Sequence, residues 1–222
     1  MKLTARAERR ALDALLRYGH PLRGPGWNPR SPPDPRLGVP RVRILLDAAA
    51  FPDLAMACVL VAGTKGKGST AAFLASILAA AGVRAGLFTS PHLQSWRERI
   101  RVDGVAVRPA AFAEAVEGAL GYVPALRRAA PHLGEPSAFE LLTVAALGHF
   151  ARERCTVAVL EVGLGGRYDA TNAVDPAVSV VTSVGLDHVA ILGPTLDRIA
   201  REKAGVMRSG RPALLAPQEP AA

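Results

Sequence analysis

A glycine-rich run at residues 63–70 constrains the fold of this 222-residue chain more than any other part of its sequence. It reads Gly-Thr-Lys-Gly-Lys-Gly-Ser-Thr, follows the apolar segment 58–62, and precedes a helix-forming segment, 69–81, that ends before Gly82. A strand that turns through glycines into a helix directs backbone N–H groups and the positive end of the helix dipole at one point. The run therefore predicts a strand, a phosphate-binding loop and a helix in succession.

The residue types within the run fit a nucleotide phosphate bound together with Mg²⁺. Its glycines permit a tight turn and close approach of the backbone, and Lys67 can reach the terminal phosphates. The run departs from the common pattern G-x-x-x-x-G-K-[ST], because a glycine follows Lys67, so a purely structural glycine turn remains the alternative. We expect the nucleotide to be bound by Gly63, Thr64, Lys65, Gly66, Lys67, Gly68, Ser69 and Thr70.

The rest of the chain alternates between apolar strands and helices. Further strands are expected at residues 85–89, 156–162, 177–184 and 213–216, with a small hairpin at 100–107. Helices are expected at 4–18, 41–50, 109–120, 137–154 and 195–209. Those at 109–120 and 137–154 are predicted to be amphipathic, and Ser137 and Thr195 to be N-caps. The alternation predicts an α/β fold with a doubly wound, mostly parallel sheet.

Charge and proline content divide the chain near residue 40. Residues 1–43 contain ten Lys or Arg and three Asp or Glu, so this segment carries nearly all of the net charge of +8. Seven of the eighteen prolines lie in residues 19–40, which favours an irregular connection. We expect a basic N-terminal arm with a short helix at 1–40 and an ATP-binding domain at 41–222. Because the basic residues do not extend across that domain, no nucleic-acid partner is expected.

The apolar segments are too short to place the chain in a membrane. Runs such as 59–62 and 157–160 fall far short of the ~20 residues that a spanning helix needs. No apolar stretch of the secretory type follows the charged residues 1–10. A cytoplasmic protein is therefore expected, with Cys58 and Cys155 as reduced, buried residues of the core.

Five segments, in order along the chain, resemble the folylpolyglutamate/dihydrofolate synthase branch of the Mur ligase superfamily. The compact loop Gly-Thr-x-Gly-Lys-Gly-Ser comes first, followed by Thr-Ser-Pro-His-Leu at 89–93 with Glu-Arg-Ile at 98–100. The most characteristic segment is 160–172, Leu-Glu-Val-Gly-Leu-Gly-Gly-Arg-Tyr-Asp-Ala-Thr-Asn. Thr-Ser-Val-Gly-Leu-Asp-His at 182–188 and Ile-Ala-Arg-Glu-Lys-Ala-Gly at 199–205 complete the set. The order and spread of these segments make coincidence an inadequate explanation.

The resemblance implies metal-binding and catalytic roles for several of these residues. Ser90, Glu161 and His188 are implied as Mg²⁺ ligands, and Lys67, Glu161, His188 and Lys203 as the catalytic set. Lys203 is implied to carry a carbamate, which would convert a cation into an anion. Taken alone, Lys203 reads as a surface lysine and His188 as a structural or surface histidine. Glu161 ends an apolar strand, where open α/β sheets bind their ligands.

A second group of residues is implied on the side of the folate substrate. These are Phe139, Glu140, Tyr168, Asp169 and Ala170. For Phe139 a place in the core of its helix is an equally good reading of the sequence. Arg167 and Asn172 fit either ligand contacts or hydrogen bonds within the loop.

The function implied by the resemblance is ATP-dependent amide ligation between a pteroate or folyl carboxylate and L-glutamate, with ATP and Mg²⁺ as cofactors and a monomeric enzyme. Members of the family continue beyond residue 222, so we expect their C-terminal domain to be missing from this chain. Three alternatives stay open. One is another Mur-type ligase, of the cell-wall or cyanophycin kind, and another is a non-catalytic nucleotide- or folate-binding remnant. The third is a general P-loop GTPase or motor, which would hydrolyse the nucleotide without any dependence on folate.

Overall fold

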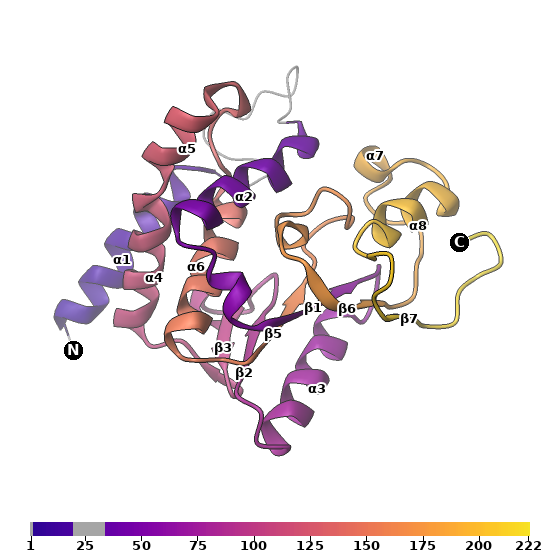
Figure 1. Ribbon diagram of the computed structural model, residues 1–222, viewed down its shortest axis with the longest axis horizontal. Coiled ribbons are helices and arrows are strands. Elements are labelled where there is room, and N and C mark those ends of the chain that lie inside the picture. Colours follow the sequence, from indigo (N-terminus) through magenta and orange to yellow (C-terminus); the bar gives the residue numbers. More distant parts are fainter. Residues whose placement is uncertain (1, 20–33) are drawn as a thin grey trace.

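A seven-stranded sheet forms the centre of the computed structural model, which describes residues 2–19 and 34–222 (Figure 1). The strands lie in the order β4-β3-β2-β5-β1-β6-β7. Neighbours from β2 to β7 run parallel, whereas β3 and β4 are antiparallel. The strands are β1 (Ala57–Ala62), β2 (Ala85–Phe88), β3 (Ile100–Val102), β4 (Val105–Ala106), β5 (Val157–Glu161), β6 (Pro176–Val181) and β7 (Ala213–Leu215). The expected mostly parallel α/β sheet is confirmed.

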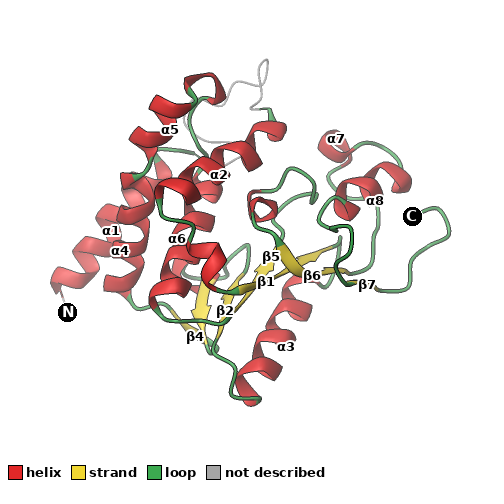
Figure 2. Cartoon of the chain, viewed as in Figure 1, coloured by secondary structure: helices red, strands yellow, loops and turns green. Residues whose placement is uncertain are grey.

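Helices cover both faces of this sheet (Figures 1 and 2). Helix α3 lies on one face against β1, β2 and β5, and α6 contacts β2 from the other. Helix α4 packs on α6, α1 packs on α4, and α2 contacts both α5 and α6. The helices are α1 (Lys2–Leu16), α2 (Gly38–Ala48), α3 (Lys67–Ala80), α4 (Pro109–Gly121), α5 (Val123–Ala129), α6 (Ala138–Arg152), α7 (Val189–Leu192) and α8 (Leu196–Ala204). This is the doubly wound arrangement that the sequence predicts.

The main hydrophobic core lies between the sheet and the helices of the α6 side. Leu60, Phe88 and Phe150 are fully buried in it. Ala11 and Leu15 of α1 belong to the same core, each with 1% of its surface exposed. The N-terminal helix is thus packed onto the sheet-bearing part of the chain. The division at residue 40 remains a prediction, and most of the expected irregular connection, residues 20–33, lies outside the described residues.

Local sequence signals account for several element ends. The Ser137 hydroxyl accepts the Glu140 N–H at the start of α6, and the Glu140 carboxylate accepts the Ser137 N–H in return, a capping box. Asp103 and Gly104, with φ of 49° and 79°, form the turn of the β3–β4 hairpin. Left-handed backbone of this kind is cheapest for glycine and tolerated by aspartate, which explains the Asp-Gly pair.

Two expectations for helices were wrong in detail. Helix α6 is not amphipathic, because the sheet and the helices α2 and α4 enclose it and nearly all of its side chains are buried. Helix α8 was expected to reach residue 209 but ends at Ala204. The chain after it turns back instead, which buries Val206 completely and leads into β7.

Both cysteines are buried and reduced, as the sequence predicts. Burial raises the pKa of Cys58 to about 12 and that of Cys155 to about 11, so neither is a reactive thiolate near neutral pH. Among the described residues, no helix has the length and apolar character required to cross a membrane.

Candidate nucleotide and folate site

The glycine-rich run forms a tight loop between β1 and α3. Gly63 and Gly66 have φ of 141° and 82°, and Gly66 is the residue from which α3 begins. A side chain at Gly63 would also place a Cβ atom 1.8 Å from Oγ1 of Thr182. Both positions therefore require glycine for conformation, and Gly63 for space as well. The loop presents its backbone at a helix N-terminus, the arrangement that binds phosphate.

Residues that follow β6 fasten this loop from the side. The Thr182 hydroxyl donates to the Lys65 carbonyl at 2.7 Å, and the Thr64 N–H donates to the Ser183 carbonyl at 2.8 Å. The Gly185 N–H donates to Oγ1 of Thr64 at 3.0 Å. Sequence reasoning missed this role of Thr182. The sequence feature that could have indicated this role is that segment 182–188 directly follows β6, the strand beside β1.

The lysines of the loop differ in their surroundings. Lys65 is exposed, whereas Lys67 is half-buried and its Nζ lies 3.4 Å from the Thr64 carbonyl, a long hydrogen bond. Among the described residues, Lys67 is in no ion pair. Its charge is therefore available to an anion in the loop. Ser69 is exposed and Thr70 half-buried in the first turns of α3.

Glu161 reaches the start of α3 from the end of β5, the strand beside β1. Only 6% of its surface is exposed, and its Oε2 accepts the Ser90 N–H at 2.9 Å. A Cβ atom at Gly68 would lie 3.2 Å from Oε1 of Glu161, so the missing side chain there gives the carboxylate its room. Burial raises the pKa of Glu161, while the Ser90 N–H and the Lys67 cation oppose that shift. The structure thus brings Glu161, Ser90 and the loop together.

His188 lies across a small gap from Gly63 and Lys67 of the phosphate loop. A cavity of about 20 Å³ is lined by Gly63, Lys67, His188 and Lys203, among others. The His188 backbone is left-handed, with φ of 48°, and its Nε2 is 3.8 Å from Oδ1 of the neighbouring Asp187. In the part of the chain that the structure describes, no three His, Cys, Asp or Glu residues form a ready metal-binding cluster. The metal roles of Ser90, Glu161 and His188 stay predictions.

Lys203 is a buried residue of α8, unlike the surface lysine that its sequence suggests when taken alone. It is 4% exposed, and its Nζ donates to the Gly63 carbonyl at 2.7 Å. Burial, together with the Lys67 cation, lowers the pKa of Lys203 to about 8. A substantial fraction of the amine is then neutral at mildly alkaline pH, which is the form that can react with CO₂.

The pH dependence of stability should reveal this lysine. Between about pH 8 and pH 10.4 the unfolded chain holds the Lys203 proton and the folded chain does not, so the free energy of unfolding rises with pH. Relative to Lys203→Met, the wild-type chain should gain about 3 kcal/mol across that window, measured by urea denaturation in CO₂-free buffer. The exposed Lys65, changed to methionine, should show no such trend. A difference between wild type and Lys203→Met that does not vary with pH would contradict the assignment.

A large cavity of about 630 Å³ adjoins this site. Ser90, His188 and Trp96 are among the residues that line it, and so are the residues predicted on the substrate side. All of the latter take part: Phe139, Glu140, Tyr168, Asp169 and Ala170. Cavities of several hundred Å³ with mainly apolar walls are typical of small-molecule sites.

The predicted substrate residues differ in how free their side chains are. Phe139 packs on Phe88, with ring centroids 5.6 Å apart, and is half-buried at the cavity wall. The Glu140 carboxylate receives two hydrogen bonds of 2.7 Å from buried Arg41, so its charge is already neutralised. Asp169 accepts the Leu164 and Thr171 N–H groups and the Thr171 hydroxyl. Burial raises its pKa against these hydrogen bonds. Glu140 and Asp169 therefore shape the cavity wall, and their contact with substrate stays a prediction.

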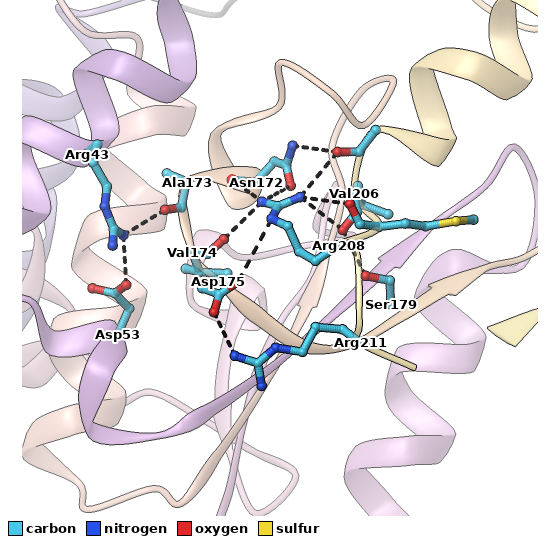
Figure 3. A network of polar contacts seen from close by, with 12 residues as sticks. Arg43, Asp53, Asn172, Ala173, Val174, Asp175, Ser179, Val206, Arg208 and Arg211 are labelled. Carbon is cyan, nitrogen blue, oxygen red and sulfur yellow. Dashed lines mark hydrogen bonds and ion pairs between the residues drawn. The ribbon is translucent and has the colours of Figure 1, made fainter. Parts of the chain in front are cut away.

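A polar network holds the 167–175 loop to the segment after α8 (Figure 3). Arg208 Nη2 donates to Oδ1 of Asn172 at 2.9 Å. Asn172 Nδ2 donates to the Arg167 and Gly205 carbonyls. The Ser179 hydroxyl donates to the Val206 carbonyl at 2.8 Å. Of the two alternatives left open for Asn172, the structure shows hydrogen bonding within the loop. The network positions α8, and with it Lys203.

Phosphate-loop geometry, a carboxylate at the same sheet edge and an adjoining cavity define a nucleotide-binding α/β domain of the Mur ligase fold. The Bacillus subtilis dihydrofolate synthase/folylpolyglutamate synthase is 39% identical over 186 residues, which cover 83% of this chain and 43% of that protein. A Mycobacterium tuberculosis folylpolyglutamate synthase complexed with ADP superposes with a TM-score of 0.85 and 33% identity, over 98% of this chain and 46% of the other. Over most of its length the chain is therefore homologous to the N-terminal portion of folylpolyglutamate/dihydrofolate synthases.

A further neighbour of known structure is an FPGS–AMPPCP–folate complex, with a TM-score of 0.83 and 32% identity over 96% of this chain. It extends well beyond the match, since only 49% of it is covered. The chain thus spans less than half the length of these relatives. No family model matched the sequence.

Proposed function

We propose that this chain supplies the ATP- and folate-binding part of an ATP-dependent ligase that joins L-glutamate to a pteroate or folyl carboxylate. The observation that carries the proposal is that the phosphate loop and the large cavity are joined by a short chain of contacts. Ser90 lines the cavity, and its N–H is bonded to Glu161, which in turn abuts Gly68 of the loop. Similar structures hold ADP, or AMPPCP with folate, which supports the same pair of ligands here.

The reaction proposed has two steps. A carboxylate oxygen of the pteroate or folyl substrate attacks the γ-phosphorus of ATP, and ADP leaves. The glutamate amine then attacks the acyl carbon, loses a proton and displaces inorganic phosphate. Lys67 and the N–H groups of the loop stabilise charge on the transferring phosphoryl group, so positioning and electrostatics do most of the work.

Mg²⁺ fits the groups in this chain of contacts. Mg²⁺ in phosphoryl-transfer sites uses one or two carboxylates together with phosphate oxygens and water, so a cluster of three acidic residues is not required. Glu161 would provide the carboxylate and Ser90 a hydroxyl, with His188 as the further predicted ligand. The ion would neutralise charge on the phosphates.

A carbamate at Lys203 is part of the proposal. The low pKa of this amine and its place beside Gly63, Lys67 and His188 support it, because a buried anion there would face the Lys67 cation. A mass increase of the native protein under bicarbonate that disappears in Lys203→Met would be the direct sign. An unmodified amine under the same conditions would count against it.

The experiment that tests the proposed function measures product as well as ATP consumption. The chain is incubated with ATP, Mg²⁺, L-glutamate and either dihydropteroate or tetrahydrofolate, and the ligated product is followed by mass spectrometry. Glu161→Gln serves as the matched inactive control. Binding of both ligands by calorimetry without turnover would instead support the remnant alternative. ATP hydrolysis at a rate that does not depend on the folate substrate would overturn the proposal.

The comparisons favour this function over another Mur-type amino-acid ligase, since the relatives reported above are folylpolyglutamate/dihydrofolate synthases. We include a monomeric state and a cytoplasmic location in the proposal. Sedimentation of the purified chain and imaging of the tagged protein in its own cell would test them.

A further inference from the structure

A buried arginine at the wall of the large cavity keeps two of its nitrogen atoms unpaired. Arg99 is 9% exposed, and its Nε donates to Nδ1 of His92 at 2.9 Å. Within residues 2–19 and 34–222, neither Nη1 nor Nη2 has a hydrogen-bond partner. Among the described residues, the one side-chain nitrogen or oxygen that is fully buried without a hydrogen-bond partner is Oδ1 of Asp53. Arg99 lines the cavity, and its Nη1 and Nη2 therefore keep contact with solvent.

The guanidinium group is held in a fixed plane. Its Cζ lies 4.5 Å from the centroid of the Trp96 ring, and His92 in turn packs on Trp96 with centroids 4.8 Å apart. To accept the Arg99 N–H, His92 must be neutral with its proton on Nε2. The stack and the hydrogen bond leave the Nη edge as the free side of the group.

Two other charged groups of the cavity lining, Arg36 and Glu140, are already paired with protein partners of opposite charge. Arg36, the second arginine of the lining, is 2.7 Å from the Asp34 carboxylate. Glu140 is paired with Arg41 behind the wall. Arg99 has no ion-pair partner among the described residues. A buried guanidinium without a carboxylate is costly for a fold to keep, so its free edge points to a ligand anion.

The position of Arg99 says which end of a ligand it would meet. Arg99 stacks on Trp96 and lines the same cavity as Ser90, whose N–H is bonded to the Glu161 carboxylate beside the phosphate loop. Glu161 is close enough to raise the pKa of Arg99 against the lowering caused by burial. An aromatic ligand seated in the cavity would therefore have its anionic end at Arg99 and toward the loop.

We propose that Arg99 is the subsite for the reacting carboxylate of the folate substrate, gripping its two oxygens with Nη1 and Nη2 while ATP approaches from the loop. A planar carboxylate and a planar guanidinium form two parallel hydrogen bonds, which fixes orientation as well as charge. The inference rests on the proposed function. It adds the residue that presents the carboxylate for phosphorylation.

The wild-type chain allows a direct test by calorimetry with pteroate and with pteroic acid amide, which has the same shape but no charge. We expect pteroate to bind about tenfold more tightly or better, as a charge-assisted bidentate contact implies. Equal affinities would overturn the role of Arg99 while leaving the pteroyl cavity in place. If neither compound binds, the proposed function itself is overturned, and this inference with it.

Variants then assign the preference to Arg99. Arg99→Met should abolish the preference for pteroate over the amide. It should do so by weakening pteroate binding, while the affinity for the amide changes less than about threefold. Arg99→Lys should keep part of the preference. Arg101→Met is the matched control, because Arg101 lies two residues further on in β3, donates to the Glu98 carbonyl and is not among the residues that line the cavity. Melting temperatures verify that each variant is folded. A full carboxylate preference in folded Arg99→Met would overturn the proposal.

Discussion

Replacing Lys67 with methionine is expected to weaken Mg²⁺–ATP binding by about 30-fold, the equivalent of about 2 kcal/mol for a charge-assisted hydrogen bond to phosphate. In a catalytically complete protein the same change should lower kcat of ligation by about 10²–10³, as for loss of one stabilising donor at a transition state. The physical reason is that Lys67 is the first residue of α3 and its side chain is largely unengaged. Within the described structure, its ammonium group makes one hydrogen bond, a long one to the Thr64 carbonyl. Calorimetry measures the affinity.

The fold should tolerate this substitution, since Lys67 makes no ion pair with a described residue and methionine retains most of its length. Lys65→Met is the matched control. It removes the same charge two residues away, from an exposed side chain, and should weaken ATP binding less than about threefold. Equal losses from the two variants would show that only the net charge of the loop matters. A large fall in melting temperature for Lys67→Met would show a structural role instead.

The parts of this fold that the sequence predicts are those encoded by neighbouring residues. The glycine loop after β1, the Asp-Gly turn between β3 and β4, and the Ser137 capping box each depend on residues within a few positions of one another. Such signals are local, so they can be recognised in one sequence. The strands β5 and β6 were equally visible, because buried parallel strands are almost wholly apolar.

The parts that could not be predicted depend on residues far apart in the chain. Arg41 and Glu140 form a buried ion pair across 99 residues, and Lys203 reaches Gly63 across 140. Nothing near either position signals its partner. The same holds for the enclosure of α6, since a helix covered on all sides has no polar face to mark it. Arg99 belongs to this group too: its sequence neighbours suggest a family segment, but only the folded chain shows its free edge.

Lys203 shows how such distant contacts join the two halves of the site. Its bond to Gly63 links α8 to the phosphate loop, and the Asn172–Arg208 network links the end of α8 to the loop that carries Tyr168 and Asp169. The nucleotide side and the cavity side are thus held by one helix. A change that moves α8 should therefore disturb both.

Gly166→Ala is the substitution that tests this most severely. A Cβ atom there would lie 2.6 Å from the Glu202 carbonyl oxygen and 2.9 Å from Cα of Lys203. These are backbone atoms of α8, which cannot rotate aside, and the Arg167 N–H already holds the Glu202 carbonyl at 2.8 Å. The helix must shift. We expect the free energy of unfolding to fall by about 3 kcal/mol, the upper range for overpacking, and the melting temperature by about 6–12 °C.

The matched control is Gly118→Ala in α4. That position is exposed and helical, and no atom lies within 4 Å of the added Cβ, so alanine should stabilise the chain by about 0.5–1 kcal/mol. Glycine-to-alanine substitution is thus expected to lower the free energy of unfolding at one position and to raise it at the other. A general effect of alanine on the unfolded chain could not produce both results. Because the shift of α8 breaks the contact between Lys203 and Gly63, Gly166→Ala should also weaken ATP and pteroate binding together. A variant as stable as wild type would mean that α8 is not held against this loop.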